Sequence, residues 1–212
     1  MAMFASREDG GVRLGRCLHE QRVRADLVLG LPRGGVVVAA GVARALDLPL
    51  DTLVVRKIGH PWHREFAVGA LAERGVVLLD ERAIGTDAVV RAELEEIVRE
   101  EGERMRNYQA RFHSGGALDL SGKAVLIVDD GLATGATAEA AVLSARKGNA
   151  EAVVVAAPVA SNGAVQRLAG VADEVRVLCA DPDFDAVGRY YDLFTQTTDE
   201  EVLELLRAAR RE

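Results

Sequence analysis

The chain has 212 residues, of which 49% are hydrophobic and 28% charged, the composition of one soluble globular domain large enough to bury a sizeable core. A formal net charge of −7 argues against broad nucleic-acid binding, and the lack of an apolar signal region or a run of ~18 apolar residues argues against a membrane protein. Two isolated cysteines, Cys17 and Cys179, exclude a disulfide framework and a zinc site, so we expect a cytoplasmic single-domain protein.

Residues 4–46 follow a helix–strand–helix pattern. Apolar side chains recur at helical spacing among Arg and Glu over 4–24, which predicts an N-terminal helix. The apolar run 27–29 predicts a buried strand, and the sequence GLPRGG that follows it predicts a tight turn before an apolar helix over 36–46. In a parallel sheet, such a turn lies at the carboxyl edge, where ligands bind.

Basic residues follow the first two predicted strands. Arg33 lies between a proline and the glycines Gly34 and Gly35 at the start of a helix, a setting that suits a pyrophosphate oxygen. A surface arginine in a turn is the plainer alternative. The second strand is predicted over 50–55, and Lys57 follows it closely. Lys57 would either reach the same edge of the sheet or be a solvated lysine at a strand end.

The segment 58–65, IGHPWHRE, combines Gly, Pro, the only tryptophan and two of the four histidines without regular periodicity. Segments of this kind are typical of functional loops, and we expect a flexible loop that contains His60, Trp62 and His63. A metal site at the two histidines is disfavoured because no further His or Cys partner accompanies them.

Two structural elements separate this segment from the next predicted strand. Residues 66–71 and 76–79 are predicted to form a β-hairpin. A helix predicted over 86–112 has apolar residues on one stripe and oppositely charged pairs on its other face. We assign structure rather than chemistry to both.

The stretch 123–140, KAVLIVDDGLATGATAEA, has the strongest functional signal. Its β-branched apolar run, 125–128, predicts a strand buried on both faces, and this strand ends at Asp129 and Asp130. A helix is predicted over 137–147, so strand, tight loop and helix follow one another. An Asp pair alone is common in a turn after a core strand, whereas the pair followed by TGAT favours a binding site.

The loop after this strand has the chemistry of an anion-binding site. Thr134 and Thr137 supply hydroxyl donors, Gly135 lets the backbone approach an oxyanion, and the next helix directs its unpaired N–H groups at the same point. Two carboxylates would repel a phosphate, so Asp129 and Asp130 need another partner, either sugar hydroxyls or Mg²⁺ held through water. A ligand with a phosphate one sugar-length from a diol is a ribose 5-phosphate.

The sequence VLIVDDGLATGAT at 125–137 resembles the thirteen-residue motif that binds phosphoribosyl pyrophosphate (PRPP) in type I phosphoribosyltransferases. The resemblance implies that the two aspartates contact the ribose hydroxyls, with Mg²⁺ held beside them through water. It implies that the 5-phosphate is wrapped by Ala133, Thr134, Gly135, Ala136 and Thr137. It also implies a pyrophosphate site made of Arg33, Gly34, Gly35 and Lys57, a cis peptide bond between Pro32 and Arg33, and closure of the segment 58–65 over PRPP.

The remaining chain completes the predicted fold. Strands over 152–157 and 174–179, separated by a helix over 162–169, predict an α/β fold whose parallel sheet is flanked by helices on both faces. A final helix is predicted over 199–210. No repeat or linker divides the chain, so residues 1–212 are expected to form one phosphoribosyltransferase domain with a core of about 26–180.

In phosphoribosyltransferases a small hood built from the chain ends holds the acceptor, which here implies about 1–25 and 181–212. Aromatic residues of the second segment could stack a flat acceptor ring or equally pack a small core of the hood; they are Phe184, Tyr190 and Tyr191. The motifs F-x-x-R at 4–7 and A-V-G-x-Y-Y at 186–191 resemble a bacterial group of this family whose acceptor is unassigned.

The resemblance implies an Mg²⁺-dependent phosphoribosyltransferase of nucleotide metabolism, which moves phosphoribose from PRPP to a nitrogenous, nucleobase-like acceptor and releases pyrophosphate. The expected catalytic residues are Arg33, Lys57, Asp129 and Asp130. The alternative is a PRPP-sensing regulator of the same fold without catalysis; a nucleotide-binding module of response-regulator type would explain the paired Asp but not TGAT. The expected partners are PRPP and a small-molecule acceptor, without nucleic acid or membrane, and a homodimer stays open.

Overall fold

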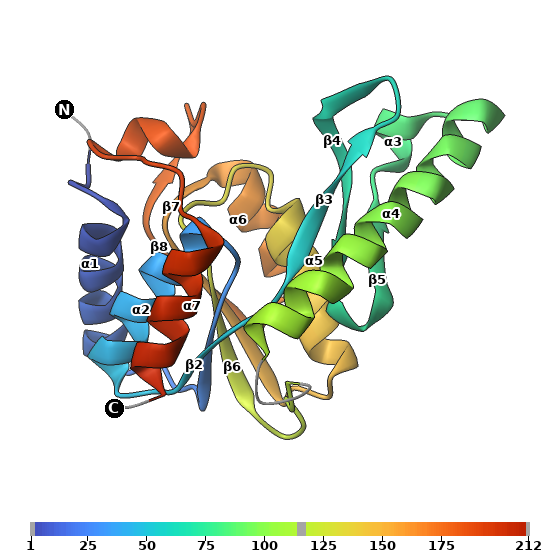
Figure 1. Cartoon of the computed structure of the whole chain (residues 1–212). Coiled ribbons are helices and arrows are strands. Elements are labelled where there is room, and N and C mark those ends of the chain that lie inside the picture. Colours follow the sequence, from blue (N-terminus) through green and yellow to red (C-terminus); the bar gives the residue numbers. More distant parts are fainter. Residues whose placement is uncertain (1–2, 114–117, 211–212) are drawn as a thin grey trace.

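The structure is a computed structural model that describes residues 3–113 and 118–210 (Figure 1). Its centre is a sheet of five strands in the order β2–β1–β6–β7–β8, and all neighbouring strands are parallel. These strands are β1 (Leu27–Gly30), β2 (Leu50–Thr52), β6 (Ala124–Val128), β7 (Ala152–Ser161) and β8 (Glu174–Asp181). The parallel sheet predicted from the apolar runs is therefore confirmed.

Helices cover both faces of this sheet, which is why its central strands are buried along almost their whole length. Alternate side chains of β6 enter two separate cores, with Leu126 in one and Ile127 in the other. The core of Leu126 contains residues of α1 (Arg7–Glu20), α2 (Gly34–Leu46) and α7 (Asp199–Ala209), and the core of Ile127 contains residues of α5 (Ala136–Lys147) and α6 (Asn162–Ala169). No helix among residues 3–113 and 118–210 combines the length and apolar character needed to cross a membrane.

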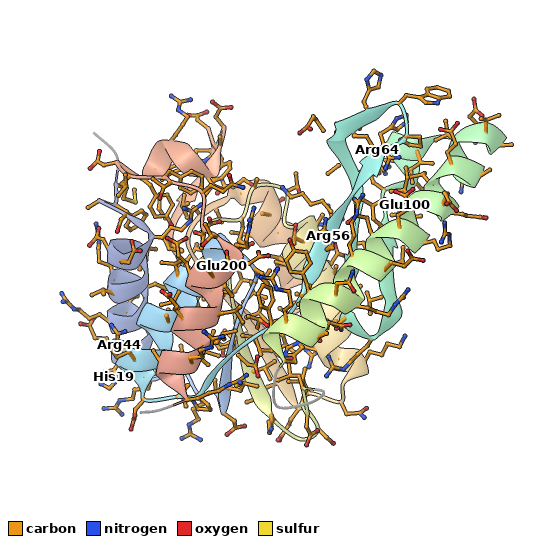
Figure 2. The ribbon with its side chains drawn as sticks, viewed as in Figure 1. His19, Arg44, Arg56, Arg64, Glu100 and Glu200 are labelled. Carbon is orange, nitrogen blue, oxygen red and sulfur yellow. The ribbon has the colours of Figure 1, made fainter. Side chains whose placement is uncertain are left out.

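A second, antiparallel sheet rises beyond the carboxyl edge of the first (Figure 1). It consists of β3 (Val55–His60), β4 (His63–Ala72) and β5 (Val76–Leu79). The long helix α4 (Ala88–Phe112) packs on one of its faces, and α5 packs on the other. Figure 2 shows Arg56 between β3 and α4, where it forms an ion pair with the buried Glu101. The short helices are α3 (Glu81–Ile84), η1 (Glu73–Gly75) and η2 (Val187–Tyr190).

Two predictions about this region are wrong. The predicted strand 50–55 ends at Thr52, and Val55 already belongs to β3 of the second sheet, so Lys57 lies within a strand rather than after one. The predicted irregular loop 58–65 is the tip of the β3–β4 hairpin. The first residues of β4 are exposed on both faces, so the sequence has no alternation of buried and exposed residues there.

Segments from the two ends of the chain meet above the carboxyl edge of the central sheet. Phe4 pairs with Tyr191 in an isolated parallel bridge, and the N–H groups of Asp192 and Leu193 donate to the carbonyl oxygens of Phe4 and Ala5 at 2.9 Å. These segments belong to the ranges predicted as a hood, of which residues 1–2 and 211–212 lie outside the part of the chain described.

Candidate active site

A cleft of about 460 Å³ opens at the carboxyl ends of β1 and β6, between the central sheet and the second sheet. Its lining includes the loop after β1, the loop after β6, and Lys57 of β3. It therefore brings together the predicted pyrophosphate, ribose and phosphate residues, which are Arg33, Gly34, Lys57, Asp129, Asp130, Ala133, Thr134, Gly135, Ala136 and Thr137. Gly35 follows in the first turn of α2.

The loops after β1 and β6 touch because glycines stand at their contact. A Cβ atom built on Gly34 would lie 2.2 Å from Oδ2 of Asp130, and one built on Gly35 would lie 2.8 Å from Oδ1 of Asp129. Any larger residue would push the two loops apart. The peptide bond between Pro32 and Arg33 is cis, as the resemblance implied. Gly34 and Gly35 thus let the backbone that follows Arg33 approach the two carboxylates closely.

The carboxylates of Asp129 and Asp130 differ in their surroundings. Asp129 accepts a hydrogen bond from the N–H of Asp130 at 2.9 Å, and burial, reinforced by the charge of Asp130, raises the pKa of the Asp129 carboxyl. The positive charges of Lys57 and Arg7 oppose this rise. Ionising Asp129 therefore costs free energy in the ligand-free protein, and a ligand that donates hydrogen bonds to it offsets that cost.

Asp130 has a cationic partner that the sequence analysis did not identify. Nε of Arg7, at the start of α1, lies 2.7 Å from Oδ2 of Asp130, and Nη1 of Arg7 donates to the carbonyl oxygen of Thr195 at 2.6 Å. The same guanidinium stacks 3.8 Å from the ring centroid of Phe194. On the other side, the hydroxyl of Tyr191 donates to the carbonyl oxygen of Asp130 at 2.6 Å. The chain ends thus hold Asp130 through its side chain and its backbone.

The loop from 133 to 137 has the geometry of a phosphate-binding turn. Gly135 adopts a positive φ of 76° at the N-terminus of α5, so the first free N–H groups of that helix face the cleft. Ser161 holds the start of this loop in place, because its hydroxyl donates to the carbonyl oxygen of Ala133 at 2.6 Å. Thr134 and Thr137 line the cleft beside these N–H groups.

The two predicted pyrophosphate cations also line the cleft. Arg33 precedes α2 and lies 3.8 Å from Asp199, at the start of α7, measured from Nη1 to Oδ1. Lys57 is exposed and projects from β3 into the same cleft. Asp199 also pairs with Arg111 of α4 at 2.7 Å, so a carboxylate is shared between Arg33 and a second arginine.

The three hood aromatics do not line this cleft. The rings of Phe184 and Tyr190 stack on each other with centroids 5.3 Å apart, and the hydroxyl of Tyr190 donates to Asp181 at 2.6 Å. Tyr191 is 4% exposed and packs between Phe4 and Phe194. The geometry is that of a small core formed by the chain ends, one of the two alternatives that the sequence left open.

Val187 of η2 is the residue of the C-terminal segment that borders the cleft. A Cβ atom on Gly131 would lie 2.6 Å from Cγ1 of Val187, which shows how closely this side chain covers the aspartate loop. The sequence analysis included Val187 in the motif at 186–191 but gave it no role, because a valine in a tail resembles any core residue. The hairpin-tip residues His60, Trp62 and His63 do not line the cleft in this structure.

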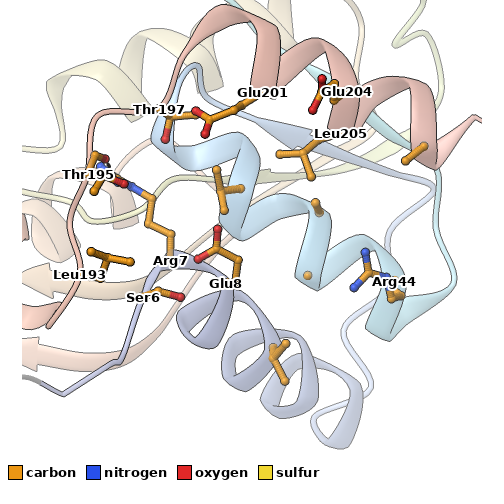
Figure 3. A pocket seen from close by; sticks show the side chains of 15 residues that line it. Ser6, Arg7, Glu8, Arg44, Leu193, Thr195, Thr197, Glu201, Glu204 and Leu205 are labelled. Atoms are coloured by element: carbon orange, nitrogen blue, oxygen red, sulfur yellow. Dashed lines mark hydrogen bonds between the residues drawn. The ribbon is translucent and has the colours of Figure 1, made fainter.

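A second cavity of about 430 Å³ lies between α1, α2 and α7 (Figure 3). In Figure 3 the side chain of Arg7 lies at one end of it, beside Thr195. Arg7 thus lines this cavity while its guanidinium contacts Asp130, which lines the cleft. The ion pair between Arg7 and Asp130 thus joins a residue that lines the second cavity to one that lines the cleft.

Known proteins resemble this chain in sequence and in fold. A family profile described as "Phosphoribosyl transferase domain" matches residues 11–194. Two Mycobacterium tuberculosis proteins, "Putative phosphoribosyl transferase MT0597" and "Putative phosphoribosyl transferase Rv0571c", are each 46% identical over 220 residues, an alignment that covers 100% of this chain and 48% of theirs. The chain therefore spans about half the length of these curated relatives.

Two solved structures share the fold. The crystal structure of TT1426 from Thermus thermophilus has a TM-score of 0.78 and 41% identity, and the match covers 96% of this chain and 97% of that one. The AQ2163 protein from Aquifex aeolicus has a TM-score of 0.52 and 14% identity, with 86% and 78% of the two chains covered. The second likeness concerns the fold alone.

Proposed function

This chain belongs to the phosphoribosyl transferase family, and from that membership we propose that it transfers phosphoribose from PRPP to a nitrogenous, nucleobase-like acceptor and releases pyrophosphate. One observation carries the proposal: a single cleft is lined by Arg33 and Lys57, by Asp129 and Asp130, and by the loop 133–137 at the start of α5. Arg33 and Lys57 match a pyrophosphate, the two aspartates match a ribose diol, and the loop 133–137 matches a 5-phosphate.

In the proposed reaction, the bond between C1 of the ribose and the pyrophosphate oxygen breaks, a bond from C1 to a nitrogen of the acceptor forms, and the proton of that nitrogen passes to solvent. The electron pair of the breaking bond leaves with pyrophosphate, whose charge Arg33 and Lys57 would stabilise. Asp129 and Asp130 would accept hydrogen bonds from the ribose hydroxyls and favour the positive charge that develops at C1. Catalysis would thus consist of positioning and electrostatic stabilisation.

The residues present fit an Mg²⁺ ion that arrives with the ligand. The described residues contain no cluster of three or more His, Cys, Asp or Glu that could bind a metal by themselves. Mg²⁺ commonly takes one or two carboxylates and completes its shell with water and substrate phosphates, and Asp129 and Asp130 supply such a pair at the cleft. When bound there, the ion would neutralise charge on the leaving pyrophosphate.

We also propose a place for the acceptor, on the premise that the ribose binds at Asp129 and Asp130. The acceptor must approach C1 from the side opposite the leaving group, and Val187 borders the cleft beside the aspartate loop. An apolar side chain there suits one face of a flat nitrogenous ring. We therefore place the acceptor between Val187 and the ribose, rather than on the stacked pair of Phe184 and Tyr190.

The test is pyrophosphate release from PRPP and Mg²⁺ with a panel of purines and pyrimidines. We expect release that depends on one acceptor class and disappears in the double variant Asp129→Asn and Asp130→Asn, with circular dichroism used to verify that the variant is folded. PRPP binding by calorimetry without release for any acceptor would favour a PRPP-sensing regulator. Absence of PRPP binding in the wild-type protein would refute the proposal.

A further inference from the structure

The cleft has a third cation that the proposed roles do not use. Among the described residues that line it, the cations are Arg33, Lys57 and Arg167. Arg33 and Lys57 belong to the β1 loop and to β3, whereas Arg167 belongs to α6, next to the loop 133–137. The cleft therefore has cations from two separate parts of the fold, together with the carboxylates of Asp129 and Asp130. The phosphate-binding loop itself offers only neutral donors, which are hydroxyl and backbone N–H groups.

Helix α6 is fixed against the phosphate-binding loop at its first turn. The hydroxyl of Ser161, which caps α6, donates to the carbonyl oxygen of Ala133 and accepts from the N–H of Ala164 at 2.9 Å. A Cβ atom on Gly135 would lie 3.3 Å from Cα of Ala164. Arg167 follows Ala164 by three residues and so lies on the same side of the helix. The backbone thus places this guanidinium beside the loop.

The guanidinium of Arg167 is held by one carboxylate and keeps other donors available. Its Nε donates to Oε2 of Glu139, in the first turn of α5. The guanidinium of Arg167 has no other hydrogen bond within the described residues, so both Nη groups stay available to a ligand. The side chain of Arg167 is 36% exposed, and that of Glu139 is 16% exposed. A phosphate in the loop would be a second anionic partner for the same guanidinium.

We propose, on the premise of the proposed function, that Arg167 binds the 5-phosphate of the phosphoribosyl substrate and that Glu139 competes with this phosphate for its guanidinium. The substrate class is then a sugar phosphate with anionic groups at both ends. Arg167 determines affinity at the 5-phosphate end, and Arg33 and Lys57 determine it at the pyrophosphate end. Removing the cation and removing its carboxylate partner must therefore change ribose 5-phosphate affinity in opposite directions.

The experiment measures binding of ribose 5-phosphate, and separately of pyrophosphate with Mg²⁺, to the full chain by calorimetry. Arg167→Gln should weaken ribose 5-phosphate binding about 10- to 100-fold and change pyrophosphate binding less than about twofold, because a hydrogen bond to a charged group is lost at one end only. Arg167→Lys keeps the charge and should restore part of the affinity. Glu139→Gln keeps a hydrogen-bond acceptor but removes the negative charge, so ribose 5-phosphate should bind more tightly, by about two- to tenfold.

Arg146→Gln is the matched control. Arg146 is 34% exposed and pairs with Asp173 at 2.8 Å, but it does not line the cleft. Its substitution should leave both affinities unchanged. If Arg167 and Glu139 only formed a structural pair, both substitutions would weaken ribose 5-phosphate binding equally. This outcome, or unchanged binding by Arg167→Gln, would overturn the inference but not the proposed function. Wild-type protein that binds neither probe would overturn the proposed function and the inference with it.

Discussion

Asp129 and Asp130 are adjacent but have different surroundings, so substituting each one should change the free energy of unfolding differently. Asp130→Asn would leave the guanidinium of Arg7, 11% exposed, without its charged partner, so we expect a loss of about 1–3 kcal/mol in the free energy of unfolding. Asp129→Asn removes a carboxyl whose ionisation the folded protein disfavours and keeps the acceptor for the N–H of Asp130. Its free energy of unfolding should therefore stay unchanged or rise. Urea denaturation at pH 7 measures both.

Ligand binding provides the internal control for these variants, since both should bind PRPP more weakly. Equal stability of Asp129→Asn and Asp130→Asn would contradict the assigned difference in surroundings.

At the scale of single residues, the sequence predicted those site residues that lie within one local motif. Asp129, Asp130 and the loop 133–137 follow one strand directly, and the structure brings them together in one cleft. Arg7 was beyond reach because its contacts lie 123 and 188 residues away in the chain. An arginine near the N-terminus has no local signal that distinguishes a buried partner of a carboxylate from a solvated side chain.

At the scale of elements, His113 links the end of α4 to η1 and β2. His113 ends α4, its Nε2 lies 2.8 Å from Glu73 of η1, and its Nδ1 lies 3.3 Å from Asp51 of β2. The contact between Nδ1 of His113 and Asp51 is an electrostatic interaction, because its geometry is not that of a hydrogen bond. Burial alone would lower the pKa of His113, but Asp51 and Glu73 outweigh it and raise this pKa to about 9. Nearby, Arg74 faces Glu73 and Arg210 faces Asp51.

This network predicts a pH dependence of stability. The folded pKa of His113 is above the unfolded value of about 6.5, so the stabilisation is complete below pH 6.5 and is lost as the pH rises through about 9. The free energy of unfolding should fall by at most about 3 kcal/mol over that range. His113→Gln should lower stability at pH 6.5 and flatten this dependence in urea titrations. A variant with the slope of the wild type would assign the dependence to other groups.

The hairpin tip gives a second prediction for an element. Trp62 is 58% exposed there and does not line the cleft, which leaves it free to report on closure. If the hairpin closes over PRPP and excludes water, Trp62 emission should shift to shorter wavelength with PRPP and Mg²⁺. Ribose 5-phosphate, which lacks the pyrophosphate, should shift it much less. Emission that stays constant while calorimetry records PRPP binding would rule out closure at this tip.

The predicted elements that match best are those buried in the central sheet. Strand 125–128 and helix 162–169 were located to within one residue because their apolar or capping residues are unambiguous. In the second sheet, the predicted hairpin 66–71 and 76–79 is confirmed as β4 and β5, whereas β3 and the exposed first residues of β4 were not predicted. Gly59 illustrates this, because a Cβ atom there would lie 2.3 Å from the carbonyl oxygen of Arg64. The glycine that suggests a loop is in fact required by close strand pairing.

For the whole molecule, the prediction concerns the junction of the chain ends. Phe4 is 1% exposed, packs 5.4 Å from the ring centroid of Tyr191, and lies beneath the guanidinium of Arg13 at 4.7 Å. Phe4→Ala should lower the free energy of unfolding by about 3 kcal/mol and weaken PRPP binding, because Tyr191 and Arg7 both contact Asp130. Urea denaturation and calorimetry measure the two effects.

The matched control is Phe66→Ala on β4, where the ring is 56% exposed. It should change stability by no more than about 0.5 kcal/mol. Equal effects of the two substitutions would show that the junction of the chain ends contributes no special stability.

The contact of Arg7 with Asp130 and Thr195 also has a consequence during protein synthesis. Translation at about 5–20 residues per second would release Thr195 roughly 10–40 s after Arg7, since 188 residues separate them. Until then, β1 and β6 have already been made, but the guanidinium of Arg7 lacks its hydrogen bond to the carbonyl oxygen of Thr195. Arg7 therefore cannot contact both Asp130 and Thr195 until residue 195 has been made, long after β1 and β6.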